Sequence, residues 1–402
     1  MSGDIGFRTI AILMETLLRK KLEWILSRNC DPIRKAQTRI FEENLAGTAN
    51  SLILCGAGLL GRRTLGCLRG IGIEPLVWVD NRSCLWNQTI EGLIVMSPEE
   101  AIRRHGASSI FVVTVFNPSG LIRQLLSLGG SRVVSYTHLY ARYAQACLPY
   151  LCMEDVANIA IHSNDIRRAY SVWSDNTSRA EFVAQLEWRQ TLDPKCLSEP
   201  CSSRETYFPP DLVKVSSEEV FVDCGAFDGD SVRTFLERVN YSCDRVIALE
   251  PDSENCRRLV DVVAMFPPEI KQKIDICNVA VGAVRGKVRF AASGSVDSGV
   301  AEFGSAEVEC VPLDDIVKSV SPTYIKMDIE GAEPEALIGA QRVLQQSRAV
   351  WAICLYHKGE HLWELPLFVA SLLHGYRLYL RRYAEDCWEL VLYAIPNERC
   401  LG

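Results

Sequence analysis

Short apolar runs separated by helical stretches recur along two parts of the chain. In the first part they occupy residues 51–55, 75–79 and 109–114. In the second part they occupy residues 220–224, 245–250, 274–281, 324–329 and 349–356. Runs of this length, alternating with helical periodicity, are typical of parallel strands that are covered on both faces. The pattern therefore predicts two successive α/β units.

The last two apolar runs predict a different connection. Residues 376–383 and 388–395 lie on either side of the tripeptide Ala384-Glu385-Asp386. Two extended runs joined so closely indicate an antiparallel hairpin with a three-residue turn. The second sheet is therefore expected to be mostly parallel and to end in an antiparallel hairpin.

The remaining segments are expected to be helical. An amphipathic helix is predicted over residues 8–26, because its apolar positions recur with helical spacing and charges interrupt them. Residues 149–215 combine helical stretches with a proline-containing loop, which is typical of a connection between domains. The predicted organisation is a helical segment at 1–47, a Rossmann-like domain at 48–148, a helical linker at 149–215 and a second α/β domain at 216–398.

Composition narrows the classes of partner and the compartment. The net charge of −7 provides no basic surplus for a phosphate backbone, so nucleic acid is not expected as a partner. No apolar stretch approaches the ~20 residues of a membrane span. The sixteen cysteines include no CxxC pair, and several lie inside apolar runs. They are expected to be reduced thiols, as in the cytoplasm, rather than disulfides or zinc ligands.

The strongest motif follows the first strand of the second unit. The strand ends at Asp223, and the turn after it contains Gly225 and Gly229. Glycines suit a turn in which the backbone bends tightly and approaches a ligand closely. Glu250 ends the next strand, 21 residues after Gly229, where a carboxylate can accept hydrogen bonds from both hydroxyls of a ribose. This spacing fits both NAD and S-adenosylmethionine (SAM).

Two features of the turn favour SAM over NAD. Its glycine pattern is Asp-x-Gly-x-x-x-Gly, which lacks the GxGxxG arrangement that cradles a diphosphate. The carboxylate of Asp223 would repel a pyrophosphate but would attract a ligand that carries an ammonium and a sulfonium. The predicted cofactor is therefore SAM.

Several segments of the second unit resemble the FkbM family of methyltransferases. Their order and spacing match over about residues 205–396, and the segment 324–333 is the most specific. The matching segments are residues 221–229, 249–252, 278–282, 313–315, 324–333 and 388–393. The resemblance implies a class I SAM methyltransferase fold, here preceded by the smaller Rossmann-like domain and the helical segments. It also implies, in most members, O-methylation of a sugar or a natural-product hydroxyl, so a small-molecule or glycan acceptor is expected.

The resemblance also implies roles for individual residues. Asp223 and Gly225 would face the methionine part of SAM, Glu250 would hold the ribose, and residues 278–280 would lie beside the adenine. The residues expected to bind the cofactor are Asp223, Gly225, Ala226, Phe227, Gly229, Glu250, Pro251, Asn278, Val279, Ala280 and Asp328. One departure is Phe227, which stands where many members have Asn.

Acidic residues and a histidine are the candidates for catalysis. A hydroxyl is a weak nucleophile until a base removes its proton. Strand alternation places Lys326, Asp328 and Glu330 on one face, and Glu333 follows on the turn. Carboxylates this close need a partner: Lys326, a Mg²⁺-like ion or the start of the following helix could provide it. His357 ends the next strand, so the expected catalytic residues are His357 or Asp328 as the base, with Glu330 beside them. No metal is predicted.

The first unit contains its own glycine motif. Residues 56–61, Gly-Ala-Gly-Leu-Leu-Gly, match GxGxxG after a strand, and Asp80 ends the next strand 19 residues later. The unit resembles the small Rossmann-like domain that precedes some sugar acyltransferases and nucleotide-sugar enzymes. It could bind the nucleotide end of the acceptor, bind a regulatory ligand or serve as a scaffold. Nucleotide-sugar binding or an NAD-dependent oxidoreductase activity of this unit is the alternative function, although no Tyr-x-x-x-Lys pair follows the motif.

Overall fold

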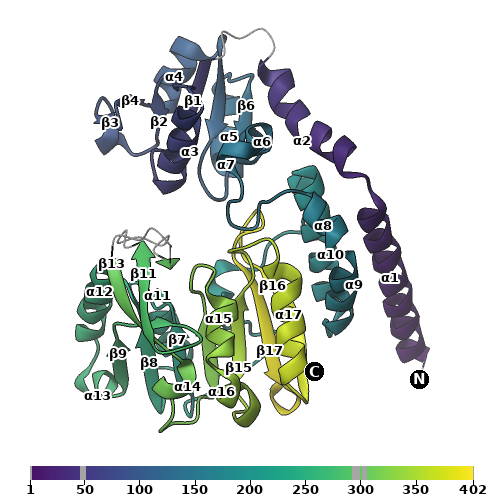
Figure 1. Ribbon diagram of the computed structural model, residues 1–402, viewed down its shortest axis with the longest axis vertical. Helices are drawn as coiled ribbons and strands as arrows, with labels where there is room; N and C mark the ends of the chain where they lie inside the picture. Colours follow the sequence, from purple (N-terminus) through teal and green to yellow (C-terminus); the bar gives the residue numbers. More distant parts are fainter. Residues whose placement is uncertain (1, 46–50, 292–298, 301–305, 402) are drawn as a thin grey trace. The chain divides into compact units, whose positions relative to one another are not determined.

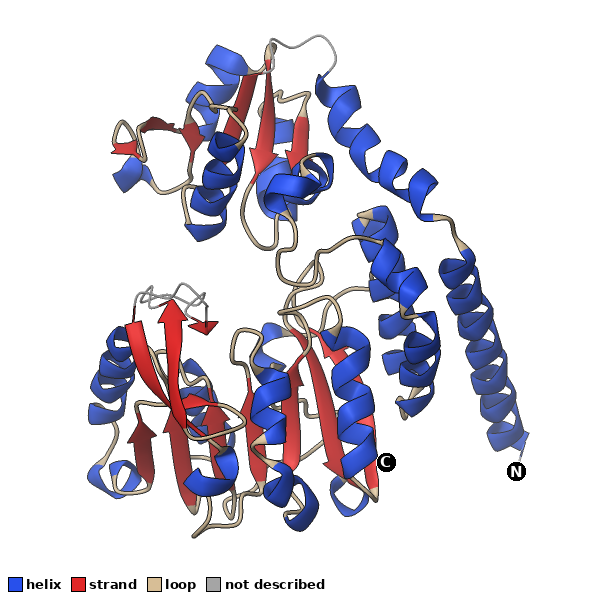
Figure 2. Cartoon of the chain, in the orientation of Figure 1, coloured by secondary structure: helices blue, strands red, loops and turns tan. Residues whose placement is uncertain are grey.

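A computed structural model describes residues 2–45, 51–291, 299–300 and 306–401 (Figure 1). Helices and strands alternate along most of the chain (Figure 2). The chain divides by its contacts into two compact units. The first consists of Met1–Ser163, Ala180–Glu199 and Ala384–Trp388, and the second of Asn164–Arg179, Pro200–Tyr383 and Glu389–Gly402.

The first unit is built around a six-stranded sheet in the order β3-β4-β2-β1-β5-β6. All neighbouring strands are parallel except β3 and β4. The three predicted strands are confirmed, because each of them overlaps a buried strand of the sheet. The sequence analysis did not predict β3, β4 and β6. The strands are β1 (Ser51–Cys55), β2 (Trp78–Val79), β3 (Thr89–Ile90), β4 (Leu93–Met96), β5 (Ser109–Val113) and β6 (Val133–Ser135).

Helices occupy the connections of the first unit and the segments around it. The predicted amphipathic helix lies within α1, whose residues Leu22 and Ile25 are buried while Ile12 and Leu17 are exposed. The helices up to residue 191 are α1 (Ser2–Ser27), α2 (Cys30–Leu45), α3 (Leu59–Gly70), α4 (Pro98–His105), α5 (Ser119–Ser127), α6 (Tyr136–Arg142), α7 (Ala144–Cys147), α8 (Ala157–Ile161), α9 (Ser163–Val172) and α10 (Asn176–Thr191).

The second unit contains a seven-stranded sheet in the order β16-β17-β15-β14-β7-β8-β9. The five strands from β15 to β9 in this order are parallel, and β17 is inserted antiparallel between β15 and β16. This arrangement confirms the mostly parallel sheet and its antiparallel hairpin. The strands are β7 (Val220–Cys224), β8 (Arg245–Leu249), β9 (Ile274–Cys277), β14 (Tyr324–Met327), β15 (Val350–Cys354), β16 (Tyr376–Arg382) and β17 (Leu390–Pro396).

Apolar side chains hold helices against this sheet. The rings of Phe221 on β7 and Phe235 on α11 stack with their centroids 4.5 Å apart, and Leu259 of α12 belongs to the same buried cluster. Helices α15, α16 and α17 lie in front of the sheet in Figure 1. The helices of this unit are α11 (Asp230–Arg238), α12 (Ser253–Ala264), α13 (Pro268–Lys271), α14 (Leu313–Ile316), α15 (Glu333–Ile338), α16 (Gln341–Gln346) and α17 (His361–Leu372).

Two of the predicted elements differ from the observed ones. The run 274–281 is not one strand, because β9 ends at Cys277 and the chain then enters a second, four-stranded sheet in the order β10-β13-β11-β12. The predicted three-residue turn is wrong as well: the hairpin strands are separated by residues 383–389. Part of this longer loop packs in the first unit, where Trp388 contacts the rings of Tyr136 and Tyr150. The strands of the second sheet are β10 (Ala280–Val281), β11 (Gly286–Ala291), β12 (Gly299–Val300) and β13 (Ala306–Val311).

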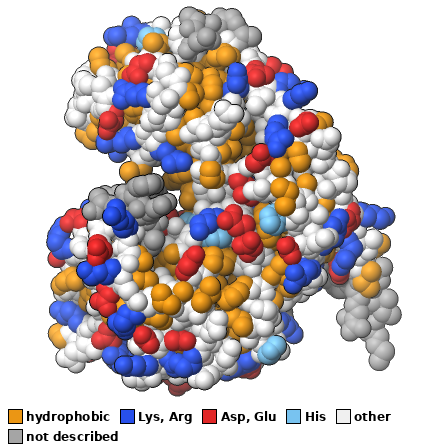
Figure 3. Space-filling model, viewed as in Figure 1, with side chains coloured by type: hydrophobic (Ala, Val, Ile, Leu, Met, Phe, Trp, Pro, Cys, Tyr) orange, Lys and Arg blue, Asp and Glu red, His pale blue; other side chains and the backbone are white. Residues whose placement is uncertain are grey.

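Two general expectations can be compared with the structure. None of the described helices is long and apolar enough to span a bilayer, and all sixteen cysteines are free thiols. On the face seen in Figure 3, basic and acidic side chains are interspersed over both units. This face therefore does not present one continuous basic surface of the kind that a nucleic acid needs.

Candidate functional site

Four of the predicted residues lie at one edge of the seven-stranded sheet. Asp223 is the fourth residue of β7, Glu250 follows β8, and Asp328 follows β14. His357 lies three residues after β15. Because these strands are parallel neighbours, their carboxyl ends meet at the same edge. This edge is where open α/β sheets bind ligands.

The turn after β7 can be formed only with glycine at its first bend. Gly225 has φ +85°, and a Cβ on it would lie 1.9 Å from the carbonyl oxygen of Asp328. The amides of Gly225 and Ala226 both donate to the carbonyl of Leu249, at 2.9 Å. Gly229, with φ +88°, then begins helix α11. The turn is thus held tightly against the ends of β8 and β14.

Phe227 adopts a backbone conformation that suits the Asn of other family members better than it suits Phe. Its φ is +48°, in the left-handed region where Asn is favoured over bulky residues. Its amide nevertheless donates to Glu250 Oε2 at 2.8 Å. This hydrogen bond between the turn and Glu250 is donated by the backbone of residue 227, so Phe in place of Asn does not remove it.

Glu250 is a buried carboxyl group held by the backbone on both sides. Oε1 accepts from the amide of Asp252 and Oε2 from that of Phe227, each at 2.8 Å. The residue is only 5% exposed. Burial raises its pKa to about 7, against the opposing effect of these hydrogen bonds. Since each carboxylate oxygen can accept a second hydrogen bond, two acceptor positions remain for two ligand hydroxyls.

Asn278 fixes the end of the next strand to the same place. Its side-chain amide donates to the carbonyl oxygens of Glu250 and Pro251, at 2.7 and 3.1 Å. Val279 follows in the connection, and Ala280 begins β10. The residues predicted to lie beside an adenine are therefore tied to the strand end that carries Glu250.

Asp223 meets a cation of the chain itself. It is fully buried, and its Oδ1 lies 3.1 Å from Lys326 Nζ, which also donates to the carbonyl of Gly225 at 2.5 Å. Ser231 lies within α11, and its hydroxyl donates to Asp223 Oδ2. Lys326, one of the possible partners of the carboxylates after β14, instead pairs with Asp223, which it faces on the adjacent strand.

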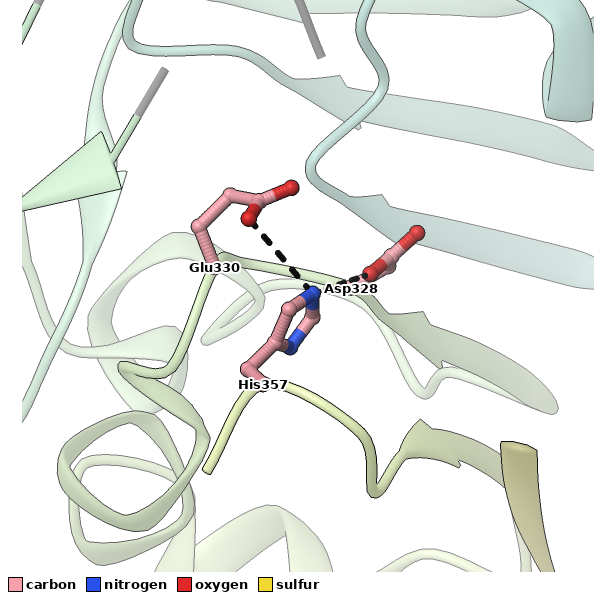
Figure 4. Close-up of side chains that lie close together, drawn as sticks. All are labelled: Asp328, Glu330 and His357. Carbon is pink, nitrogen blue, oxygen red and sulfur yellow. Dashed lines mark ion pairs between the residues drawn. The ribbon is translucent and has the colours of Figure 1, made fainter. Parts of the chain in front are cut away.

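The three predicted catalytic residues come together as expected from their strands. His357 Nε2 lies 3.2 Å from Asp328 Oδ1 and 3.7 Å from Glu330 Oε2 (Figure 4). On its other side, His357 Nδ1 lies 2.8 Å from Glu333 Oε1. Both His357 and Glu333 are buried. Glu330 reaches this position from a left-handed backbone, with φ +56°.

The charges of this cluster depend on one another. Burial raises the pKa of Asp328. His357 and Lys326 have the opposite effect, which is larger in sum, so the pKa lies well below its usual value. For His357 the signs are reversed: burial lowers its pKa, but Glu333, Glu330 and Asp328 raise it well above its ordinary value. The structure thus holds Asp328 ionised beside a histidine that favours its protonated form.

Three further residues at this site were not assigned from the sequence. Tyr207 donates from its hydroxyl to Asp328 Oδ2 at 2.7 Å, and Tyr356 donates to Oδ1 at 3.2 Å. The pKa of Glu389 is raised to about 7, first by burial and then by the charge of Asp328. Tyr356 is the last residue of the apolar run 349–356, directly before His357. Glu389 lies in segment 388–393, one of those that resemble the FkbM family. Tyr207 lies in a loop, and its role follows only from the fold.

The glycine motif of the first unit has the geometry of a nucleotide-binding turn. Gly56 has φ +116°, and a Cβ on Gly61 would lie 1.9 Å from the carbonyl oxygen of Gly56. No described atom lies within 4 Å of the position of a Cβ on Gly58. Asp80 accepts from the Ala57 amide at 3.0 Å, but Arg82 also binds both of its carboxylate oxygens. Asp80 therefore has fewer acceptor positions left for ligand hydroxyls than Glu250 has.

A family model matches the part of the chain that contains the site. The match covers residues 223–383, and its description is methyltransferase FkbM domain. Residues 223–383 are an FkbM methyltransferase domain. This match supports methyl transfer as the chemistry of the domain, and Asp223, Glu250, Asp328 and His357 lie within it. The oxidoreductase alternative is not favoured.

A solved structure shows the same fold. The chain is similar to a crystal structure of an FkbM methyltransferase from Methylobacillus flagellatus KT, with a TM-score of 0.73 and 22% identity over 96% of this chain and 100% of that one. It is also similar to a putative rRNA methylase from Clostridium thermocellum, with a TM-score of 0.32 and 9% identity over 51% and 99% of the two chains. The second likeness is too distant to bear on function. No curated protein matches the chain.

Proposed function

We propose that the chain transfers the methyl group of SAM to a hydroxyl group of a sugar or natural product. The observation that carries this proposal is the buried carboxyl of Glu250 at the carboxyl edge of the sheet, beside the glycine turn. An FkbM domain implies SAM as the methyl donor. The sixteen free thiols support a reducing compartment, and we expect the protein in the cytoplasm.

The residues of this edge fit SAM part by part. The two remaining acceptor positions of Glu250 suit the two ribose hydroxyls. The turn from Gly225 to Gly229 would receive the amino-acid part, and residues 278–280 would lie beside the adenine. Asp223 would act on the amino-acid part through this turn, since Lys326 links its carboxylate to the carbonyl of Gly225.

SAM supplies a methyl group on a sulfonium, which is a good leaving group. A bond forms between the acceptor oxygen and the methyl carbon, the carbon–sulfur bond breaks, and sulfur keeps the electron pair. The chain must therefore align the acceptor and accept its proton. We assign proton removal to the ionised Asp328, with the protonated His357 and Glu330 beside it, because these groups converge next to the cofactor turn.

Methyl transfer can be tested directly on the full chain. Incubation with methyl-labelled SAM should place the label on hydroxyl-bearing sugars or natural products, and not on matched acceptors in which an amine replaces the hydroxyl. Label found on the amines alone would contradict O-methylation.

Cofactor choice can be tested by thermal unfolding. SAM should raise the melting temperature of the full chain, because a ligand that binds the folded state stabilises it. The shift should be much smaller for Glu250→Gln. A shift with NAD that is equal in size and equally sensitive to Glu250→Gln would contradict the assignment.

The affinity for SAM should also depend on pH through Glu250. With a pKa of about 7, the free carboxyl is protonated at lower pH and can then accept fewer hydrogen bonds from the ribose. We expect the Kd to be about tenfold higher at about pH 6 than at about pH 8. Of Asp252 and Lys326, the charged neighbours of Glu250, Lys326 has a pKa above its usual value and stays ionised over this range. Calorimetric titration of wild type and Glu250→Gln checks this, and an equal pH dependence in both proteins would contradict it.

A further inference from the structure

Three atoms that could bind a metal converge at the ends of β14 and β15. Asp328, Glu330 and His357 each offer one ligand atom, and these atoms all lie within 4.8 Å of one another. Ligands about 2.1 Å from one ion lie about 3.0 Å apart when adjacent and about 4.2 Å apart when opposite. The distances from His357 Nε2 to Asp328 and Glu330, 3.2 and 3.7 Å, are in this range. We propose that Asp328, Glu330 and His357 bind a divalent metal ion.

The histidine provides independent support for a ligand at this position. The side chain of His357 is 1% exposed, and its Nε2 makes no hydrogen bond of good geometry with any described residue. Its Nε2 nevertheless points toward the carboxylates of Asp328 and Glu330 (Figure 4). A buried polar atom without a hydrogen bond is costly, whereas an ion at this position would satisfy it.

The far side of the imidazole has the surroundings of a metal-bound histidine. Glu333 is fully buried, and its Oε1 lies 2.8 Å from His357 Nδ1. The same oxygen accepts from the amide of Ile329 at 3.0 Å, which fixes its position. Histidines that bind metals almost always present their second nitrogen to a carboxylate, a carbonyl or water. Glu333 therefore acts as a positioning residue that directs Nε2 toward the ion.

The buried ammonium group of Lys326 does not pair with the proposed metal ligands. Lys326 lies on β14, two residues before Asp328, but it is engaged by Asp223 and by the carbonyl of Gly225. Asp328 accepts hydrogen bonds from the hydroxyls of Tyr207 and Tyr356, which carry no charge. Lys326 is therefore engaged elsewhere, and the group that faces the two carboxylates is His357, which binds an ion in its neutral form.

The donor set indicates the class of ion. Two carboxylates and one imidazole suit Mn²⁺, whereas Mg²⁺ prefers oxygen ligands throughout. Three protein ligands leave positions for water or for an oxygen of the substrate. If the proposed function holds, an acceptor hydroxyl at such a position would lose its proton to water more readily, because the ion lowers its pKa, and Asp328 and His357 would then hold the ion rather than act as the base. Only this last role depends on the proposed function.

Manganese binding tests the site on the full chain. After removal of metals by a chelator, titration with Mn²⁺ followed by electron paramagnetic resonance should show one bound ion per chain. Glu330→Gln should raise the Kd for Mn²⁺ at least tenfold. The matched control is Glu335→Gln, because Glu335 is an exposed glutamate five residues further on and should bind Mn²⁺ as wild type does.

Folding and function are kept separate in this test. Glu330 is partly exposed, so Glu330→Gln should fold, and its unchanged affinity for S-adenosylhomocysteine would confirm that it does. Absence of Mn²⁺ binding in the wild type, or equal affinity in wild type and Glu330→Gln, would overturn the site. Mn²⁺ binding that depends on Glu330, in a protein without methyl transfer to any acceptor, would support the site and overturn the proposed function instead.

Discussion

Replacing Glu250 by alanine should weaken the binding of SAM by at least about tenfold, since each hydrogen bond to a charged group contributes about 1.5–3 kcal/mol. The carboxyl is buried and oriented by the amides of Phe227 and Asp252 before any ligand arrives. Its removal takes away the acceptors for both ribose hydroxyls and leaves these two amides without their partner. Calorimetric titration with SAM or S-adenosylhomocysteine measures the effect.

Two further variants separate the role of this carboxylate from a general disturbance. Glu250→Gln keeps the size of the side chain but replaces one acceptor oxygen with a donor, so it should weaken binding less than alanine does. Glu254→Gln changes an exposed glutamate at the start of α12 and should bind SAM as the wild type does. Equal affinity of Glu250→Ala and wild type would remove the ribose assignment.

The largest loss of stability is expected from Lys326→Met. This change leaves the carboxylate of Asp223 buried without its cation, and it removes the donor to the carbonyl of Gly225. Burial lowers the pKa of Lys326, but Asp223 and Asp328 raise it above its usual value, so the lysine is charged at neutral pH, while burial raises the pKa of Asp223 against the opposing effect of Lys326. Removing one partner of a buried ion pair costs about 3–5 kcal/mol of unfolding free energy.

An exposed ion pair of the same unit provides the control. Lys287 and Glu307 lie 2.6 Å apart, but their side chains are 75% and 57% exposed. Lys287→Met should therefore change the stability far less than Lys326→Met does. Urea unfolding of both variants checks this, and Asp223→Asn combined with Lys326→Met should recover part of the loss. A loss in Lys326→Met no larger than that in Lys287→Met would contradict the account.

The strands with uniformly apolar sequences could be predicted because every residue in them is buried. In β5 and β15 each position is covered, so the apolar run and the strand nearly coincide. Short or partly exposed strands such as β3 give no comparable signal. The break between β9 and β10 was missed, because the apolar run continues while the chain passes from one sheet to another.

The residues of the site could be predicted where a motif fixes them, but their partners could not. Glu250 and Gly225 follow from the spacing of strand ends, and their backbone contacts agree with that reasoning. The pairing of Asp223 with Lys326 depends on β7 and β14 being neighbours in register, which a local pattern does not reveal. Tyr207 reaches Asp328 from 121 residues away, so only the fold brings the two together.

A crystal structure of the full chain with S-adenosylhomocysteine would test most directly whether Glu250 holds the cofactor. We predict both ribose hydroxyls within hydrogen-bonding distance of its carboxylate and the amino-acid part in the turn between Gly225 and Gly229. Density for the nucleoside at the Gly56–Gly61 turn of the first unit, with only solvent against Glu250, would contradict this assignment.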